Sequence, residues 1–323
     1  MRPEPGPSSV VAPETQRLRP ASGQRIVAIG DLHGDLDAAR RALVLAGAID
    51  SGDRWIGGRL VVVQVGDQID RGDQDREVLD LFDRLREEAA RYGGAAHSLL
   101  GNHELMNASG SLHHVTPKGF LGFAELAPAG AAAGRFAKYP PRIRGRAAAF
   151  APGGAYARRL SGRPVVLQLG HNLFVHGGIL PEHASYGLGR MNREVGQWLR
   201  EESNVLPEQV FGPRGVLWTR HLGKDRPEPA HCRVLAETLG MVGAKRLVVG
   251  HTRQPKGINS ACDGLVWRID VSLSSAYGPR PSEVLELRPD HVGPIRSTAR
   301  DPARLRPSRR LVSPSSPGAA PPP

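Results

Sequence analysis

The sequence predicts an α/β fold, and two observations support this. Short apolar runs rich in β-branched residues recur along the 323-residue chain, and each ends at a glycine or a polar cluster. Near-continuous apolar runs of this length are typical of strands that are buried on both faces. Patterns of helical period lie between several of these runs, and alternation of strands with helices is typical of α/β proteins.

The apolar runs predict seven strands in order along the chain. They are expected at residues 26–29, 60–65, 97–100, 165–169, 173–175, 247–249 and 265–271. Residues 105–163 break the alternation, because they are rich in Gly, Ala, Pro and Arg and contain no clear strand pattern. We expect this stretch to form a helical or irregular insertion over the functional site.

Three helices are expected between the strands. Asp35 can cap the first helix, which places Leu36 and Leu43 on one face and ends near Gly47. The second helix carries apolar residues at helical spacing between positions 78 and 89 and stops at a Gly-Gly pair. The third helix is expected at residues 231–240.

The two ends of the chain differ in composition from its centre. Residues 1–24 are rich in Pro, Ser and Arg, and residues 288–323 end in SPSSPGAAPPP. Such segments cannot bury enough apolar surface to offset their chain entropy, so we expect two disordered tails around one domain at residues 25–287. The net charge is +11, the basic residues are mostly arginines, and several of these arginines crowd the C-terminal tail. A solvated tail is the simpler interpretation, with nucleic-acid binding as the alternative.

Cysteine usage and hydropathy limit the class of protein. Cys232 and Cys262 are the only cysteines, so neither a disulfide framework nor a cysteine zinc site is expected. Two buried free thiols are expected rather than one bridge between them. No apolar run reaches the roughly 18 to 20 residues of a membrane helix, and no signal peptide is visible. These observations favour a cytoplasmic protein without a membrane partner.

Five of the predicted strands run directly into short polar segments that contain glycine. These segments are GDLHGD (30–35), GDQIDRGD (66–73), GNHE (101–104), HGG (176–178) and GHT (250–252). Ligands bind outside the carboxyl ends of strands in open α/β sheets, so the five segments should converge on one site. GDQIDRG and GNHE are specific patterns, whereas GHT is weak by itself.

The side chains in these segments suit metal ions. The candidate ligands are Asp31, His33, Asp67, Asn102, His176 and His251. Oxygen and imidazole donors of this kind favour Mn, Fe or Zn and exclude a thiolate site. One carboxylate shared by two cations would hold them about 3.5–4 Å apart, a spacing used in phosphoryl transfer.

With these motifs in order, the chain resembles the calcineurin-like metallophosphoesterases, in particular their PPP-type phosphatase branch. The runs NHELM (102–106), HGGI (176–179) and LWTR (217–220) are similar to those of the Shewanella-like protein phosphatases. The resemblance covers about residues 25–287. It implies a four-layer αββα sandwich of two mixed sheets and a centre with two metal ions.

The resemblance also implies a role for each matched residue. Asp31 and His33 would bind the first metal and Asp67 would bridge, while the second metal would take Asn102, His176 and His251. A hydroxide held between the cations would be the nucleophile.

The remaining implied roles concern the substrate. His103 would protonate the leaving group, with Asp70 fixing its tautomer. Arg71 would hold the phosphate oxygens through its planar fork, Arg220 is a second candidate for this role, and Asn102 would also contact the phosphate.

Other polar and aromatic residues receive simpler roles. Asp35 and Asp73 are expected to cap helices. Glu104 is expected to form hydrogen bonds within its loop or around the ligands, and Asp270 to orient a ligand histidine or cap a turn. Surface or structural roles are expected for His113, His114, His171 and His221. Core or pocket-wall roles are expected for Trp198, Trp218 and Trp267.

Three functions compete on this evidence. The first is hydrolysis of phosphomonoesters on phosphoproteins, at Ser/Thr and/or Tyr. The second uses the same metal centre to cleave dinucleoside polyphosphates or other small molecules. The third is a non-catalytic protein that binds nucleic acid through its basic surface. The sequence departs from the eukaryotic PPP enzymes at 219–221, where Thr-Arg-His replaces their Ser-Asp-Pro.

Overall fold

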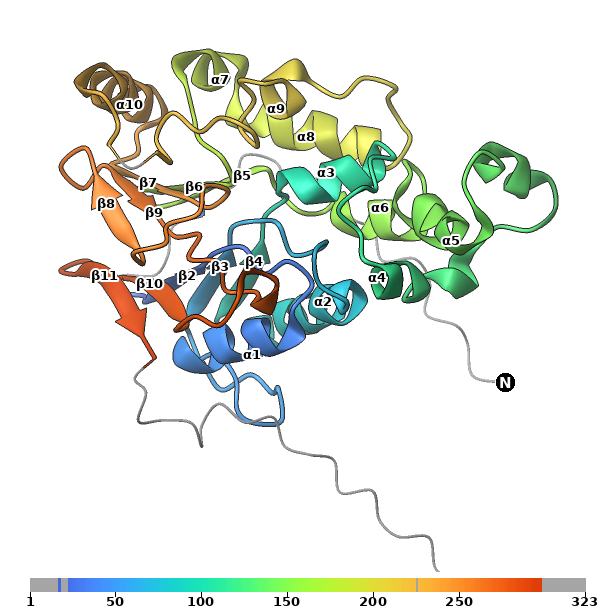
Figure 1. Ribbon diagram of the computed structural model, residues 1–323. Helices are drawn as coiled ribbons and strands as arrows, with labels where there is room; N and C mark the ends of the chain where they lie inside the picture. The colour runs from blue at the N-terminus through green and yellow to red at the C-terminus, as the bar shows by residue number, and fades with distance from the viewer. Residues whose placement is uncertain (1–16, 19–22, 225, 298–323) are drawn as a thin grey trace, which may run out of the picture.

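Two β-sheets face each other, and helices cover the outer face of each sheet (Figure 1). The structure, a computed structural model, describes residues 17–18, 23–224 and 226–297. The four layers follow the order helix, sheet, sheet, helix, so the predicted αββα sandwich is confirmed.

The first sheet has five strands in the order β11-β10-β2-β3-β4. Their bounds are β2 Ile26–Ile29, β3 Val61–Gln64, β4 Ala95–Ser98, β10 Glu283–Leu287 and β11 Val292–Arg296. Strands β2, β3 and β4 run parallel, and β10 pairs antiparallel with both β2 and β11. Helices α1 (Leu36–Leu45) and α2 (Asp75–Arg91) cover the outer face (Figure 1).

The second sheet has six strands in the order β1-β5-β6-β7-β9-β8. Their bounds are β1 Arg17–Leu18, β5 Val166–Leu169, β6 Asn172–Val175, β7 Arg246–Val249, β8 Asn259–Ala261 and β9 Val266–Arg268. Strands β6, β7 and β9 are parallel to one another. Its outer face is covered by α7 (Pro181–Tyr186), α8 (Leu188–Leu199) and α10 (Pro229–Val242), with α9 (Glu208–Phe211) beside them (Figure 1).

Side-chain alternation explains why the strands read as continuous apolar runs. Phe174 and Val248 point between the two sheets and join the core that contains β2 and β3. Their neighbours Leu173, Val175 and Val249 point the other way and pack under the helices. Because both faces are buried, polar residues do not alternate with apolar ones in these strands.

The stretch at 105–163 is helical and contains no strand, as predicted. Its helices and the one that leads into it are α3 (Asn102–Ala108), α4 (Pro117–Leu121), η1 (Ala124–Leu126), η2 (Gly130–Phe136), α5 (Pro141–Phe150) and α6 (Ala155–Leu160). In Figure 1 it follows β4 and packs beside α2, at one end of the sandwich.

Most predicted elements lie within two residues of the observed ones. The side chain of Asp35 accepts a hydrogen bond from Ala38 N at 2.7 Å, which confirms it as the cap of α1. The strand expected at 265–271 is shorter, because only Val266–Arg268 pair with the sheet. The sequence pattern missed β8, β10 and β11, which are short or carry polar residues.

The expected helix cap at Asp73 is wrong. Helix α2 begins at Asp75 and its N-cap position is Gln74, so Asp73 lies too far from the first helical N–H groups. Its carboxylate instead accepts a hydrogen bond from Thr116 Oγ1 at 2.7 Å. Asp73 therefore links the loop after β3 to the start of α4.

The expected boundaries also require correction. β1 lies inside the predicted N-terminal tail, and β11 lies beyond the boundary at 287. Both are edge strands whose backbone hydrogen bonds come from a partner strand, and such pairing leaves little hydrophobic signal in the sequence. Residues 1–16, 19–22 and 298–323, with most of the C-terminal arginines, lie outside the described residues.

Cys232 and Cys262 form a disulfide bond, so the expectation of two free thiols is wrong. Cys232 lies on α10 and Cys262 lies in the turn between β8 and β9, with their Cα atoms 5.2 Å apart. Packing of α10 beside this turn brings together two positions that are 30 residues apart in sequence. Among the described residues, no helix is both long and apolar enough to cross a membrane.

Removal of this bridge should destabilise the fold. Closing a loop of this size restricts the unfolded chain, so Cys232→Ser with Cys262→Ser should lower the free energy of unfolding by about 2–4 kcal/mol in urea titrations. The denatured but unreduced parent protein should take up no thiol-alkylating reagent. Uptake of two equivalents under those conditions would contradict the bridge.

Candidate metal centre and catalytic site

The loops that follow β2, β3, β4, β6 and β7 meet at one edge of the sandwich. The carboxyl ends of the parallel strands of both sheets face this edge, which is where α/β proteins bind ligands. The loops open into a cavity of about 680 Å³. Most of the predicted site residues line it, namely Asp31, His33, Asp67, Arg71, Asn102, His103, Arg220 and His251.

The backbone of these loops adopts unusual conformations. Positive φ angles occur at His33 (45°), Asp67 (54°), Asp70 (71°), Arg71 (67°) and His251 (63°). A non-glycine residue in this region carries strain, which persists only where the surrounding structure holds it in place. The surrounding structure therefore constrains the backbone of these loops.

Two glycines make room for the carboxylates. A Cβ atom on Gly101 would collide with Asp67 Oδ1, and one on Gly250 would collide with Asp31 Oδ1. The glycines of GNHE and GHT are thus required by close approach of the backbone to a candidate ligand.

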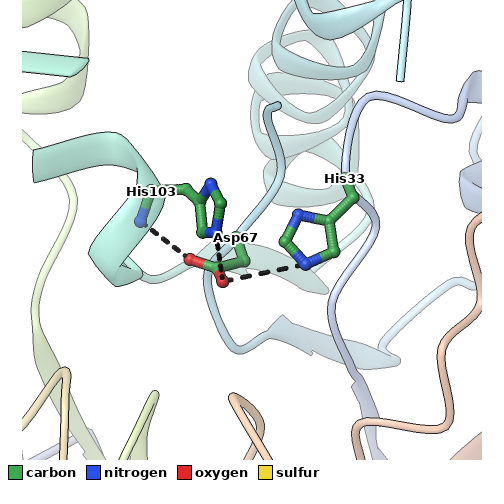
Figure 2. Close-up of side chains that lie close together, drawn as sticks. All are labelled: His33, Asp67 and His103. Atoms are coloured by element: carbon green, nitrogen blue, oxygen red, sulfur yellow. Dashed lines mark hydrogen bonds and ion pairs between the residues drawn. The ribbon is translucent and has the colours of Figure 1, made fainter. Parts of the chain in front are cut away.

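Asp67 lies at the middle of the site. Its Oδ2 is 3.2 Å from His176 Nε2, 3.9 Å from His33 Nε2 and 3.8 Å from His103 Nε2. Figure 2 shows this carboxylate between the rings of His33 and His103. Two residue groups could each hold a metal ion, His33–Asp67–His103 and Asp67–His176–His251, and Asp67 belongs to both.

Asn102 and Asp31 complete the predicted ligand set. Asn102 Oδ1 is 2.9 Å from His176 Nε2, and Asp31 Oδ2 is 4.0 Å from His33 Nε2. The backbone N–H of His251 donates to Asp31 at 3.2 Å. All six predicted ligands lie at this edge and are at most 6% exposed, so water solvates none of them fully.

Backbone carbonyls orient the candidate histidine ligands. His33 Nδ1 lies 3.2 Å from Ile69 O, and His176 Nδ1 lies 3.0 Å from Val65 O. Each contact suits an Nδ1–H donor and leaves Nε2 free to face the carboxylates. His251 differs from these two, because the nitrogen that contacts a backbone carbonyl is Nε2, which lies 3.2 Å from Trp218 O.

The electrostatics of the site favour bound cations. Burial and the neighbouring Asp270 raise the pKa of Asp31 well above its usual value, and burial raises the pKa of Asp270 as well. Burial opposes ionisation of Asp67 too, but His176 and His103 hold its pKa well below its usual range. No described lysine or arginine forms an ion pair with Asp31 or Asp67. Buried carboxylates without such partners fit metal ions.

The histidines divide into two protonation classes. Burial lowers the pKa of His33 to about 3 and that of His251 to about 2, so both are neutral, which is the form that binds metals. Burial also opposes protonation of His176, but Asp67 and Asp31 raise its pKa to about 9. A metal ion at this position would compete with that proton.

His103 and Asp70 form a buried pair. His103 Nδ1 lies 2.7 Å from Asp70 Oδ2, and His103 Nε2 faces the cavity 3.4 Å from Arg71 Nη2. Burial opposes the charged imidazole, but Asp67 and the hydrogen bond with Asp70 raise its pKa. A protonated ring with Nε2 toward the cavity can donate a proton there.

Three arginines surround the cavity. Arg71 and Arg220 were predicted, and Arg220 Nη1 donates to His251 O at 2.7 Å. Arg253 was not predicted, although it lies only two residues beyond His251. Its guanidinium lies over the ring of Tyr277 at 4.9 Å, and Tyr277 also lines the cavity. No sequence motif marks Tyr277, which lies in the short helix η3 (Ser275–Tyr277) after β9.

His113 and His114 both line the cavity, and the ring of His114 is 4.9 Å from that of His103. His113 is exposed, which agrees with the surface position expected for it. Both histidines lie in the segment after α3, and the sequence pattern did not indicate that this segment lines the cavity. His171 and His221 do not line the cavity.

The remaining predicted residues have defined contacts. Glu104 is fully buried and accepts hydrogen bonds from Gly101 N (2.7 Å), Asp67 N (3.0 Å) and Gln68 N (2.8 Å), so it ties two loops together. Asp270 lines the cavity and accepts a hydrogen bond from Ser272 N at 2.9 Å. Trp198 and Trp267 pack in the cores and Trp218 lines the cavity, as expected for core and pocket-wall residues.

Comparison with known proteins agrees with this geometry. Residues 24–255 match the family model described as "Calcineurin-like phosphoesterase". The chain is 38% identical to Shewanella-like protein phosphatase 2 of Arabidopsis thaliana, over 83% of this chain and 76% of that protein. It is 30% identical to Shewanella-like protein phosphatase 1 of Plasmodium berghei, over 84% of this chain and 74% of that protein.

A solved structure shares the fold. The crystal structure of a cold-active protein-tyrosine phosphatase of a psychrophile Shewanella sp. matches with a TM-score of 0.69 at 24% identity, over 91% of this chain and 84% of that one. The family match spans the five loop motifs up to Pro255. The chain therefore belongs to the calcineurin-like phosphoesterases and is a metal-dependent phosphoesterase similar to the Shewanella-like protein phosphatases.

Proposed function

We propose that the protein hydrolyses phosphomonoesters on phosphorylated proteins, at Ser/Thr and/or Tyr, with two metal ions. One observation carries the proposal: Asp67 is shared by two metal-holding groups, and the His103–Asp70 pair faces the same cavity. The identity to two Shewanella-like protein phosphatases supports proteins as substrates.

The residues that would hold the metals follow from the donor set. Asp31 and His33 would bind one ion, Asn102, His176 and His251 the other, and Asp67 would contact both. Oxygen and imidazole donors suit Mn, Fe or Zn. When bound, two such cations lower the pKa of a water and neutralise phosphate oxygens.

His103 could serve either as a ligand or as an acid, because it lies in one metal-holding group. We assign it as the general acid. Asp70 at 2.7 Å stabilises the protonated imidazole, and a protonated nitrogen cannot bind a metal. Asp31, 4.0 Å from His33, takes the ligand place instead. His103 Nε2 would give its proton to the oxygen of the leaving group.

The residues at the rim of the cavity would bind the phosphate and the group attached to it. Arg71 and Arg220 provide planar donors for phosphate oxygens, with Asn102 as a further contact. Arg253 adds a third positive charge, and Trp218 and Tyr277 form apolar walls. This mixture suits a phosphorylated side chain on a peptide.

Location and other partners stay predictions. The cytoplasm was expected, but a stable disulfide is more typical of oxidising compartments, so the Cys232–Cys262 bridge counts against it. A non-catalytic nucleic-acid role is disfavoured, because the full predicted ligand set is gathered at one edge.

Replacing the shared carboxylate should remove the metal centre. Asp67→Asn should lower turnover of p-nitrophenyl phosphate by about 100-fold or more. Even replacing a residue that only forms a hydrogen bond to a metal ligand lowers metal affinity or activity by about 10–100-fold. Bound metal, measured by elemental analysis, should fall with it. Asp37→Asn, on the exposed face of α1, is the matched control and should retain both. Full activity of Asp67→Asn would remove the bridging role.

Loss of the general acid should depend on the leaving group. His103→Asn should lower kcat on phenyl phosphate by about 10²–10⁴-fold. The fall on p-nitrophenyl phosphate should be smaller, because a good leaving group needs little protonation. Equal losses on both substrates would count against His103 as the acid.

The substrate class can be tested directly. The three arginines at the rim could also hold the phosphates of a dinucleoside polyphosphate, which is the competing activity. Purified enzyme with added Mn²⁺ should have a higher kcat/KM on phosphopeptides carrying phospho-Ser, -Thr or -Tyr than on dinucleoside tetraphosphate. The reverse order would favour the small-molecule function.

A further inference from the structure

Arg146 is the largest fully buried side chain among the described residues. It belongs to α5, in the helical segment at 105–163, and it lies far in sequence from every motif of the site. A buried guanidinium is costly unless each of its donors is paired. The identity of its partners therefore indicates what it does.

All three nitrogens of Arg146 are engaged. Nη2 donates to Asp70 Oδ1 at 2.8 Å, and Nη1 donates to Asp75 Oδ2 at 2.5 Å. Nε donates to Asn107 Oδ1 at 2.8 Å, and Nη1 also donates to Gly119 O at 3.1 Å. The guanidinium thus joins two carboxylates and an amide that are themselves buried.

Two aromatic rings fix the plane of this guanidinium. The centre of the Arg146 guanidinium is 5.0 Å from the ring of Phe123 and 5.0 Å from the ring of Phe150. Cation–π contacts of this kind favour a flat guanidinium over a compact ammonium. Lysine could carry the charge but could not reach both carboxylates in the same geometry.

The Asp70 carboxylate is held on both of its oxygens. Oδ2 lies 2.7 Å from His103 Nδ1, and Oδ1 accepts from Arg146. Asn107 Nδ2 lies 3.0 Å from each Asp70 oxygen and from His103 O. Asp70 therefore cannot rotate away from His103 without breaking its bond to Arg146.

We propose that Arg146 is a positioning residue, which fixes the ionised Asp70 carboxylate and thereby aims His103 Nε2 at the leaving-group oxygen. This inference rests on the proposed role of His103 as the general acid. In that step a hydroxide oxygen forms the new P–O bond and the old P–O bond breaks, its electron pair staying on the leaving oxygen. The His103 proton moves to that oxygen, and the ring becomes neutral with Nδ1–H still bound to Asp70. The helical segment at 105–163 thus supplies part of the catalytic geometry.

The test compares leaving groups in Arg146→Met, which removes the charge but can still pack between Phe123 and Phe150. We expect kcat on phenyl phosphate to fall by about 10–100-fold, as for other residues that orient a functional group. On p-nitrophenyl phosphate the fall should stay within about threefold. Bound metal should be unchanged. Arg146→Lys should show the same dependence on the leaving group, and it replaces Arg146→Met in this test if Arg146→Met does not fold.

Arg159→Met is the matched control. Arg159 lies on α6 of the same segment and pairs with two carboxylates of α2, Asp80 and Asp83, but it does not touch Asp70 or His103. Its replacement should change kcat on the two substrates equally or not at all. A steep dependence on the leaving group in this control would mean that the segment acts only by general packing, and would overturn the inference.

A double variant separates the inference from the function on which it rests. If Arg146 acts through His103, then Arg146→Met should change kcat by less than about twofold in a His103→Asn background. Two outcomes would overturn the role of Arg146 alone. One is that the losses of kcat in the two single variants add up in the double variant. The other is that kcat depends on the leaving group in His103→Asn but not in Arg146→Met. A flat dependence in His103→Asn itself would overturn both assignments.

Discussion

The central constraint on this structure is a group of carboxyl side chains buried between the ends of two sheets. Asp31, Asp67 and Asp270 lie at the edge where the parallel strands of both sheets end, and each is at most 2% exposed. Burial of uncompensated carboxylates opposes folding, and the described arginines and lysines form no ion pair with Asp31 or Asp67. Imidazoles offset part of this charge. A pair of bound cations would offset the rest, so the same cations would supply the chemistry of the site and stabilise the folded protein.

The segments around these carboxyl groups are held by buried polar contacts as well as by the first turn of α3. Glu104 binds three backbone N–H groups and thereby ties the GNHE loop to the loop that carries Asp67. Glycines at 101 and 250 let the backbone approach the carboxylates, and five site residues retain positive φ angles. Such strain is tolerated because the surrounding hydrogen bonds leave no alternative conformation.

The helical segment after β4 has more than one function in the molecule. It covers one side of the cavity through His113 and His114, and its helix α5 carries Arg146 to the buried Asp70. The cavity rim on the other side comes from Trp218, Arg220 and Arg253, which follow α9 and β7. The substrate-facing walls therefore come partly from the segments that carry candidate ligands, as with Arg71 and Arg253, and partly from other parts of the chain.

The sequence by itself determined the α/β class, the buried strands and the six candidate ligands. Strands buried on both faces leave long apolar signals, and each ligand directly follows one of them, so local patterns were sufficient. Only the tertiary structure decided which distant residues join the site or each other. Arg146, Tyr277, His114 and the Cys232–Cys262 pair reach their partners through packing between elements far apart in sequence. Edge strands such as β11 were missed for a related reason, since backbone pairing does not require a hydrophobic pattern.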